Sequence, residues 1–374
     1  MSNLNIVALE PYYGGSHKVF IDKIISESSH NWNLLTLPAY KWKWRMTHSA
    51  YTFSRELRKN NSVSPDVIFC SDMLNLAEFR GLAGEYSTIP VIAYFHENQL
   101  AYPKSYDPSR DFGFEWMNMT TALSADQVWF NSHYHKELFF DKMAVKIKKA
   151  QDFMPSGIIE EIKIKSSVIY QWVREFPEPS DIRKPGPLRI LWSARWEQDK
   201  NPEDFFNALK IIKEKGIDFS LSVVGGGNAR NASPVFEKIR KEFAGQIENW
   251  GYIESKCDFE NILINCDIVV STAMHEFFGI SVAEAVSAGA FPVVPDRLAY
   301  PEVLREGDED KGKESFFYGE SADDLAEKLI SLAGLLKNSD SLWEGDRLRG
   351  VRKIRHFYPE NIISEIDQKI VSCV

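Results

Sequence analysis

Cysteine is scarce in this sequence. The 374 residues contain four cysteines, and no two of them form a Cys-x-x-Cys pair. Disulfide frameworks and structural zinc sites need closely spaced cysteines, so the scattered Cys70, Cys257, Cys266 and Cys373 exclude both as the basis of the fold. A reducing cytoplasm is the compartment that this cysteine usage favours.

Long hydrophobic runs and an excess of positive charge are also absent. No apolar stretch approaches the roughly 20 residues that cross a bilayer, and Met1–Asn5 has no signal-peptide character. The chain has 44 Lys and Arg against 53 Asp and Glu, a net charge of −9, which excludes a protein that coats nucleic acid non-specifically. The acidic excess falls mainly in the second half, so a local basic patch in the first half is compatible with the composition.

What the chain has is a globular composition, 44% hydrophobic and 26% charged, and enough length for two to three domains. Short β-branched or aromatic runs alternate with stretches of helical length, which predicts parallel strands joined by helices. The predicted strands are Leu4–Leu9, Leu34–Leu37, Val67–Ser71, Val91–His96, Gln127–Asn131, Val168–Val173, Leu188–Ala194, Phe219–Val224, Glu248–Tyr252, Ile268–Ser271 and Phe291–Val294. The predicted helices are Lys18–Ser28, Phe112–Leu123, His133–Met143, Pro202–Lys215, Pro234–Phe243, Phe259–Asn265, Ser281–Ala288 and Ala322–Leu336.

A proline-rich segment divides this alternation. Residues 174–187 hold four prolines and many charges, which is typical of an interdomain linker. We therefore predict an α/β protein with two doubly wound domains, residues 1–180 and 181–374, whose strand ends face a central cleft. The end of the chain is predicted to be helical with a break at Pro359, and its last helix, about residues 359–373, is a candidate to cross back to the first domain.

The strongest chemical signal is a pair of carboxylates, Glu276 and Glu284, around a glycine that opens a helix. Backbone amides near Phe278, Gly279, Ile280 and Ser281, together with the helix dipole, make an anion site. If the segment were helical throughout, the carboxylates would be roughly 12 Å apart, which suits a diphosphate with a hydroxylated group at each end. The alternative is an acidic helix start with one solvent-facing glutamate.

Two cations precede this motif in the same domain. Arg195 leaves the first strand of the second half and Lys200 stands just before the next helix, where they could neutralise a diphosphate leaving group. Alone, each could equally be a surface charge. Gly225 and Gly226 follow another strand and allow close approach of a ligand, and Tyr252 could stack on a nucleobase; a plain turn and a core strand explain these three residues equally well.

Polar residues also follow two predicted strands of the first half. Gly14 and Gly15 precede a helix and could present amides to a phosphate, although the spacing is not the Gly-x-Gly-x-x-Gly of dinucleotide-binding folds. His17 follows them. His96, Glu97 and Asn98 end another strand, where ligands of α/β folds bind, and His96 is a candidate sugar contact opposite Arg195 and Lys200.

The segment Lys41, Trp42, Lys43, Trp44 and Arg45 interleaves cations with aromatic residues. Such a segment can stack on bases and contact phosphates, or it can be an amphipathic loop packed by its tryptophans. Asp308-Glu309-Asp310 superficially resembles a metal-binding motif, but its charged, glycine-flanked surroundings predict a solvated loop. We therefore expect no metal and no bound cofactor.

Taken together, the motifs of the second half resemble the retaining family 4 glycosyltransferases of the GT-B fold. That family carries a Glu-x7-Glu motif, matched by Glu276 and Glu284, and an Arg…Lys pair, matched by Arg195 and Lys200. The resemblance implies that the first glutamate contacts the donor hexose, the second the ribose, and the two cations the diphosphate. Phe277 stands where proline or glycine is usual, which changes the turn but not the charges.

The first half resembles the glycosyltransferase family that includes tRNA-queuosine α-mannosyltransferase. The resemblance lies in residues 10–18, 36–45, 72–78 and 94–103. It implies a cytoplasmic, retaining hexosyltransferase that moves mannose from GDP-mannose to queuosine in a tRNA anticodon loop, with the acceptor on residues 1–180 and the nucleotide-sugar on residues 181–374. In that reading His17, Lys41–Arg45, Glu97 and Asn98 face the acceptor. The alternatives are a lipid or polysaccharide acceptor, and a sugar-nucleotide- or RNA-binding protein without turnover.

Overall fold

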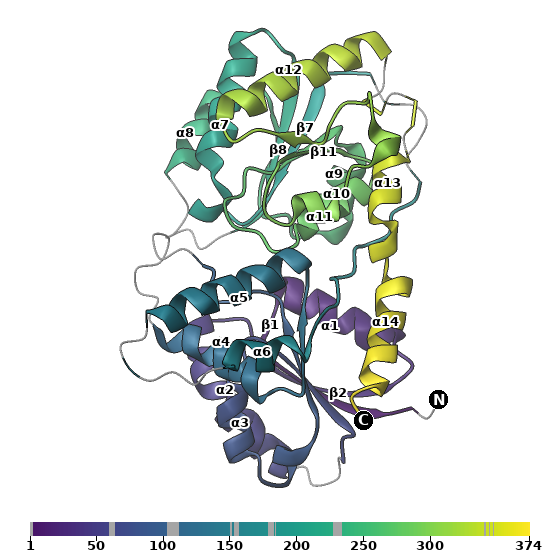
Figure 1. Ribbon diagram of the computed structural model, residues 1–374. Helices are drawn as coiled ribbons and strands as arrows, with labels where there is room; N and C mark the ends of the chain where they lie inside the picture. Colours follow the sequence, from purple (N-terminus) through teal and green to yellow (C-terminus); the bar gives the residue numbers. More distant parts are fainter. Residues whose placement is uncertain are drawn as a thin grey trace. The chain divides into compact units, whose positions relative to one another are not determined.

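The computed structural model describes residues 3–59, 64–102, 112–149, 152, 157–178, 183, 185–226, 234–339, 342–343, 345–346 and 348–374. The chain forms two compact units, one of Met1–Trp172 with Pro359–Val374 and one of Val173–Tyr358 (Figure 1). Each unit contains a parallel six-stranded sheet with helices on both faces, so the predicted α/β class with two doubly wound sheets is confirmed. No helix among the described residues is long and apolar enough to cross a membrane.

The sheet of the N-terminal unit has the strand order β2-β1-β3-β4-β5-β6. Its strands are β1 (Asn5–Tyr13), β2 (Asn31–Pro38), β3 (Val67–Ser71), β4 (Val91–Phe95), β5 (Gln127–Phe130) and β6 (Ser166–Val168). The predicted strand Val168–Val173 is wrong for most of its length. That run is apolar because it is buried and not because it joins the sheet: the Trp172 indole donates a hydrogen bond to the Phe20 carbonyl at 3.2 Å.

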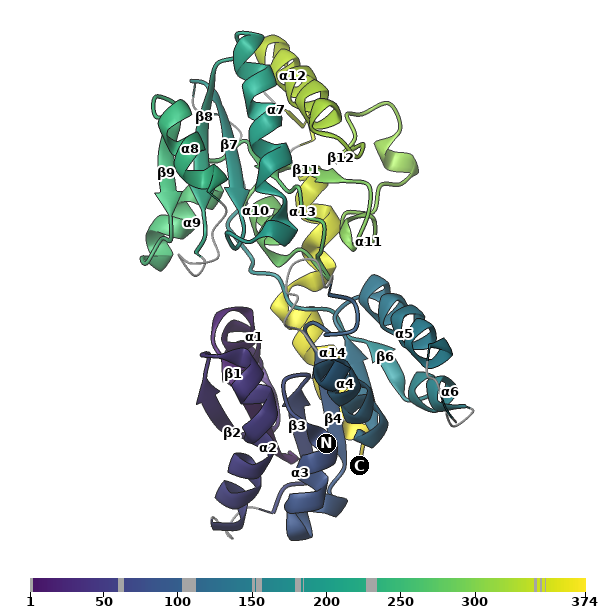
Figure 2. The same ribbon diagram turned by 90° about the vertical axis from the view of Figure 1, so that its left-hand side faces the viewer.

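Helices cover both faces of this sheet (Figure 2). They are α1 (Gly15–Glu27), α2 (Trp42–Lys59), α3 (Leu76–Leu82), α4 (Phe112–Ser124), α5 (His133–Lys148), α6 (Ile158–Lys163) and α14 (Pro359–Val371), with a 3-10 turn at Gly84–Thr88. Helices α2 to α6 share one core with alternate strand residues, in which Phe53, Phe79 and Phe139 are fully buried. On the other face lies α1, where the Phe20 ring stacks on Tyr94.

The last helix of the chain belongs to the N-terminal unit. Asp367 of α14 accepts hydrogen bonds from the Ser28 hydroxyl at 2.6 Å and from the Ser29 backbone N–H at 2.7 Å, just after α1 ends. The boundary between the units falls between Trp172 and Val173 and not between residues 180 and 181. It falls early because the residue after Val173, Arg174, already forms an ion pair with Glu260 of the C-terminal unit.

The C-terminal unit has the strand order β12-β11-β10-β7-β8-β9. Its strands are β7 (Leu188–Ser193), β8 (Phe219–Val224), β9 (Ile247–Gly251), β10 (Ile268–Val270), β11 (Phe291–Pro295) and the short β12 (Phe317–Tyr318). Its helices are α7 (Pro202–Glu214), α8 (Val235–Glu242), α9 (Lys256–Asn265), α10 (Ile280–Ser287), α11 (Tyr300–Val303), α12 (Ala322–Ser339) and α13 (Arg349–Ile354), with 3-10 turns at Gln198–Lys200, Asp308–Asp310 and Arg355–Phe357. Because all paired strands are parallel, the loops that follow them gather at one edge of the sheet, where ligands of such folds bind.

Candidate active site

The centre of the C-terminal site is a partly buried ion pair between Lys200 and Glu276. Lys200 ends the 3-10 turn after β7, and Glu276 lies in the loop between β10 and α10. The Lys200 Nζ atom is 3.2 Å from Glu276 Oε2 and 3.3 Å from an Asp199 carboxylate oxygen, and it donates a hydrogen bond to the His275 carbonyl at 2.8 Å. The structure therefore brings together two residues that the sequence motifs singled out separately.

Hydrogen bonds between the two loops hold this pair in place. The Thr272 hydroxyl donates to the Lys200 carbonyl at 2.8 Å, and the Met274 N–H donates to the Asp199 carbonyl at 2.8 Å. The Trp192 indole of β7 reaches Thr272 Oγ1 at 3.3 Å. The ammonium group is thus fixed before any ligand arrives, which is the arrangement that stabilises charge in a transition state without reorganisation.

Both members of the pair are charged at neutral pH. Burial alone would lower the pKa of Lys200, but the carboxylates of Glu276 and Asp199 outweigh it and hold that pKa above its usual value. Burial would raise the pKa of Glu276, but the Lys200 charge and hydrogen bonds from Lys200 and the Phe278 N–H hold it below its usual value. The Glu276 side chain stays 26% exposed, so a ligand can reach it.

Arg195 lies just beyond the end of β7 with its side chain 55% exposed. Its Nη1 atom is 3.5 Å from Glu197, a surface pairing that a ligand can compete with. Close to this point, Gly225 has φ +134°, and a Cβ there would lie 1.9 Å from the Ala194 carbonyl oxygen. A Cβ on Gly226 would lie 3.2 Å from the ring of Tyr252, whose side chain is 73% exposed.

The sequence motif predicts that the backbone amides at the start of α10 are available to an anion, and the structure differs from this prediction in one respect. Glu276 Oε1 itself accepts the N–H of Phe277 at 3.0 Å and of Phe278 at 3.5 Å, so those amides are already paired. The Phe278 side chain is buried with its ring edge on Phe357. Gly279 has φ +85°, and a Cβ there would lie 2.7 Å from the Tyr300 ring. In the first turn of α10 the Val282 and Ala283 N–H groups donate to the Gly279 carbonyl at 3.0 Å, so the Ile280 and Ser281 N–H groups are the ones that point out of the helix start.

The roughly 12 Å estimate for the separation of Glu276 and Glu284 assumed a helix through both residues. That assumption is wrong, because α10 begins at Ile280 after the left-handed Gly279. Glu284 lies on α10, 15% exposed, with its carboxylate 3.7 Å from the Nε atom of Arg174. Burial and the nearby Glu260 raise the pKa of Glu284, while Arg174 opposes them. The sequence analysis missed Arg174 as a site residue because it lies in the segment interpreted as linker.

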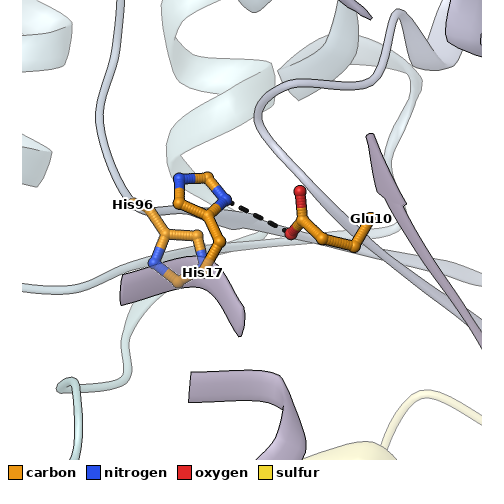
Figure 3. A group of neighbouring side chains, drawn as sticks. All are labelled: Glu10, His17 and His96. Carbon is orange, nitrogen blue, oxygen red and sulfur yellow. Dashed lines mark hydrogen bonds and ion pairs between the residues drawn. The ribbon is translucent and has the colours of Figure 1, made fainter. Parts of the chain in front are cut away.

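The N-terminal unit holds a second polar cluster, formed by Glu10, His17 and His96 (Figure 3). Glu10 lies on β1, His17 on α1 and His96 directly after β4. The His17 Nδ1 atom is 3.2 Å from Glu10 Oε2, and the His17 ring lies over the His96 ring with centroids 4.0 Å apart. Glu10 also accepts a hydrogen bond from the Ser71 hydroxyl at 3.0 Å.

The two histidines differ in charge. Burial alone would lower the pKa of His17, but the Glu10 carboxylate raises it to about 9. Burial and the adjacent His17 charge hold the pKa of His96 well below its usual value. A third carboxyl group, Asp72, accepts the His96 backbone N–H at 2.9 Å, and its own pKa is raised to about 8 by burial. The charged His17 ring therefore lies against a neutral His96 ring. A neutral histidine has one ring nitrogen that donates and one that accepts a hydrogen bond.

Glu10, His17 and His96 are also close enough to hold a metal ion, since their ligand atoms lie within 4.8 Å of one another. An ion would displace the His17 proton and its hydrogen bond to Glu10, because metals bind neutral imidazole.

The other predicted residues of the N-terminal unit surround this cluster or begin α2. Gly15 opens α1 with φ +53°, and a Cβ on Gly14 would lie 2.4 Å from Ala39 Cβ. Asn98 is fully buried and its Oδ1 accepts the Ala101 N–H at 2.8 Å, while Glu97 is half-buried and accepts a hydrogen bond from the Gln99 side chain at 3.4 Å.

The segment Lys41–Arg45 is not a loop. Helix α2 begins at Trp42, and the Trp42 ring packs on Phe114 with centroids 5.2 Å apart, whereas Trp44 is 58% exposed. The solvated loop predicted at residues 308–310 is also wrong for Asp310. That side chain is buried and accepts hydrogen bonds from Arg349 at 2.7 Å and Lys353 at 2.6 Å, so it anchors α13.

Comparison with known proteins identifies the class. Residues 175–340 match the family described as glycosyl transferases group 1. Among solved structures, the lipopolysaccharide outer core galactosyltransferase WaaB superposes with a TM-score of 0.64 at 16% identity, covering 99% of this chain and 100% of that chain. The sucrose-phosphate synthase of Thermosynechococcus elongatus superposes with a TM-score of 0.72 at 12% identity and 99% coverage of both chains. The protein has the GT-B fold and is a glycosyltransferase.

The particular family follows from the other matches. Residues 5–173 match the family described as tRNA-queuosine alpha-mannosyltransferase N-terminal. The chain is 34% identical over 310 residues to the tRNA-queuosine alpha-mannosyltransferase of Drosophila melanogaster, covering 80% of this chain and 81% of the relative. A GDP-mannose-dependent alpha-(1-6)-phosphatidylinositol dimannoside mannosyltransferase of Mycobacterium tuberculosis is 20% identical over 65% of this chain and 60% of that one. The chain belongs to the tRNA-queuosine α-mannosyltransferase family.

Proposed function

We propose that this protein transfers mannose from GDP-mannose to queuosine in a tRNA anticodon loop, with retention of the α configuration. The observation that carries the donor half is the fixed Lys200–Glu276 pair beside the exposed Arg195. The acceptor and the identity of the sugar are supported by the name of the Drosophila melanogaster relative. The requirement for GDP is supported by the name of the mycobacterial relative.

In this mechanism the bond between the anomeric carbon and the β-phosphate oxygen of GDP-mannose breaks, and GDP leaves with an additional negative charge on its diphosphate. Lys200, Arg195 and the amides at the start of α10 stabilise that charge. An acceptor hydroxyl attacks from the same face, and its proton passes to the departing phosphate oxygen. No side chain of the site has to act as a nucleophile, and no metal is needed because the cations supply the charge.

The remaining residues orient the two substrates. In this proposal Glu276 accepts hydrogen bonds from hexose hydroxyls and Glu284 from the ribose, both as carboxylates that are already partly desolvated. Gly225 and Gly226 allow the nucleotide to approach the backbone, and Tyr252 offers an exposed ring for the base. His96, kept neutral by burial and by the charge of His17, is assigned to the sugar, with the acceptor on the N-terminal unit.

The test is transfer of label from GDP-[14C]mannose to tRNA. Total tRNA that contains queuosine should become labelled, and tRNA from cells unable to make queuosine should not. The Glu276→Gln variant serves as the matched inactive protein, and UDP-glucose as the donor control. Label in both tRNA samples would overturn the queuosine acceptor. Label only in an added lipid or polysaccharide fraction would replace tRNA as the acceptor, and no label in any fraction would leave a binding protein.

A further inference from the structure

The outer face of helix α2 carries a combination of side chains that packing does not explain. Its inner face, with Met46, Ala50, Phe53 and Leu57, is fully buried at helical spacing. On the opposite face Trp44 is 58% exposed and Tyr51 50% exposed, and Tyr40 just before the helix is 63% exposed. A helix that needs only to cover a sheet would place short polar residues at such positions.

Charge on this face has one dominant sign. Between Tyr40 and Lys59 the sequence has six Lys and Arg residues and a single acid, Glu56, in a protein whose net charge is −9. The cations Lys41, Arg55, Arg58 and Lys59 are exposed. The face is thus a local cationic strip on an acidic protein, and it attracts a polyanion where the rest of the surface does not.

Polar side chains contact each of the exposed aromatic rings, and the Lys41 ammonium lies 5.3 Å from the Tyr40 ring centroid. Arg55 Nη1 donates a hydrogen bond to the Tyr51 hydroxyl at 2.8 Å, with its guanidinium 5.7 Å from the Tyr51 ring centroid. Arg45 Nε donates to the Pro38 carbonyl at 2.9 Å and Nη1 lies 3.0 Å from His48, whose ring is 5.0 Å from that of Trp44. Rings that are ordered in the free protein lose little entropy on binding a base.

The direction of helix α2 brings its N-terminal end toward the polar cluster of Glu10, His17 and His96. It begins shortly after β2 ends, at the sheet edge where His96 follows β4, and β3 starts at the opposite edge after the helix ends. The Cα atoms of Trp44 and Lys59 are about 22 Å apart along the helix axis at 1.5 Å per residue. Tyr40 and Trp44 therefore lie with Lys41 at the end nearer the polar cluster of Glu10, His17 and His96, Tyr51 lies in the middle of the helix, and the exposed cations Arg55, Arg58 and Lys59 lie at the end away from the cluster.

We infer that the outer face of α2, from Tyr40 to Lys59, is an RNA-docking surface that receives the unpaired bases of a loop on Tyr40 and Trp44 and the phosphates of the adjoining stem on Arg55, Arg58 and Lys59. Unstacked loop bases are recognised by aromatic stacking, and duplex RNA by contacts to its backbone, so the two ends of the strip fit the two parts of a hairpin. The inference rests on the proposed tRNA acceptor, which it deepens by assigning the surface.

The experiment compares two double charge reversals in binding of a fluorescently labelled, queuosine-containing anticodon stem-loop RNA. Arg55→Glu with Lys59→Glu should weaken binding at least tenfold and reduce the slope of log K against log salt by about two, one for each lost phosphate contact. The matched control is Lys142→Glu with Lys148→Glu, which reverses two exposed lysines of α5 in the same unit. Trp44→Ala should weaken binding about tenfold with no change in the salt slope, because stacking carries no charge.

Two further readouts separate this proposal from the function on which it rests. The α2 variants should bind GDP-mannose as the wild type does and should raise KM for tRNA. The docking surface on α2 is wrong if both double reversals weaken RNA binding equally, or if the α2 variant keeps the wild-type KM for tRNA. Either result leaves the proposed mannose transfer unaffected. If the wild type transfers no mannose to tRNA but RNA binding still depends on α2, the proposed acceptor fails and the surface stands.

Discussion

The two polar clusters of this protein differ in their exposure and in how their charge depends on pH. In the C-terminal unit Lys200 faces two carboxylates, Asp199 and Glu276, and the cluster is open enough to leave Glu276 26% exposed. In the N-terminal unit the Glu10 and His17 side chains are 6% and 10% exposed, and the charge depends on a histidine proton. The first cluster keeps its charges throughout the neutral range, whereas the second changes charge with pH. In the proposed mechanism the first cluster neutralises the charge of the leaving group, and the second positions a neutral His96.

The largest effect that distinguishes the clusters should come from Lys200→Met. Removing the ammonium leaves the buried Asp199 and the partly exposed Glu276 without their cation, which should cost up to about 3–5 kcal/mol of unfolding free energy, the loss when a buried pair is broken. Transfer activity should fall by at least ~10³-fold, since both the charge and the loop geometry are lost. Urea denaturation measures the unfolding free energy, and kcat/KM measures the transfer activity. The control is Lys215→Met, which removes an exposed lysine of the same unit. Wild-type stability would contradict the central place given to this pair.

The Arg195→Ala variant should lose activity without losing stability. Because the side chain is exposed, the unfolding free energy should change by less than about 0.5 kcal/mol. We expect kcat to fall on the order of 10²–10³-fold, the usual loss when one preorganised group is deleted. Arg240→Ala, at an exposed position on α8, should leave kcat unchanged. Near wild-type turnover of Arg195→Ala across a panel of nucleotide-sugars would remove the diphosphate role from this residue.

A smaller effect is expected from His17→Gln in the N-terminal unit. Loss of the cationic ring that supports His96 should lower kcat about tenfold to a hundredfold, as a misplaced group does, with little change in KM for GDP-mannose. The pKa of His96 should rise toward its usual value once the His17 charge is gone, so the variant should lose activity at acid pH where the wild type does not. An unchanged pH profile would indicate that His17 only fills space.

Stability should fall with rising pH in the N-terminal unit. The folded pKa of His17, about 9, exceeds its unfolded value of 6.5, so its contribution is complete below pH 6.5 and is lost as pH rises to 9. The folded pKa of Asp72, about 8, exceeds 3.8 because burial disfavours the charge, so stability also declines between pH 3.8 and 8. Denaturant titrations should show a decline of a few kcal/mol. His17→Gln should flatten the upper window and Asp72→Asn the lower; a pH-independent difference from wild type would refute the assignment.

The smallest effect should come from metal removal. Dialysis against EDTA should leave kcat/KM within about twofold of the untreated protein, because Lys200 and Arg195 supply the charge that a metal would otherwise provide. The comparison is with enzyme reloaded with Zn²⁺ or Mn²⁺. A loss of activity restored by metal and abolished in His17→Gln would instead make Glu10, His17 and His96 a metal site.

The sequence was sufficient for most strands but not for the short strand β12 or for every helix. Buried parallel strands such as Val91–Phe95 are continuous apolar runs and were predicted within a residue. Helix α2 was not predicted, since its four core residues are separated by charged and aromatic residues that dominate the local pattern. The strand predicted at Val168–Val173 failed for the opposite reason, because burial by α1 produces the same apolar run as a sheet does.

For the site, spacing motifs identified individual residues but not their partners. The pairing of Lys200 with Glu276 and of Arg174 with Glu284 joins segments far apart in the chain, and only the fold brings them together. Asp310 illustrates the same limit: a run of three acids is usually solvated, yet Arg349 and Lys353 of α13 bury this one.

Calorimetric titration of GDP and of guanosine tests whether the C-terminal unit binds the diphosphate of the donor with Lys200 and Arg195. The wild type should bind GDP much more tightly than guanosine. Arg195→Ala should lose most of that difference while its affinity for guanosine stays unchanged. If Arg195→Ala weakens GDP and guanosine equally, or neither, the diphosphate is not bound where this account assigns it.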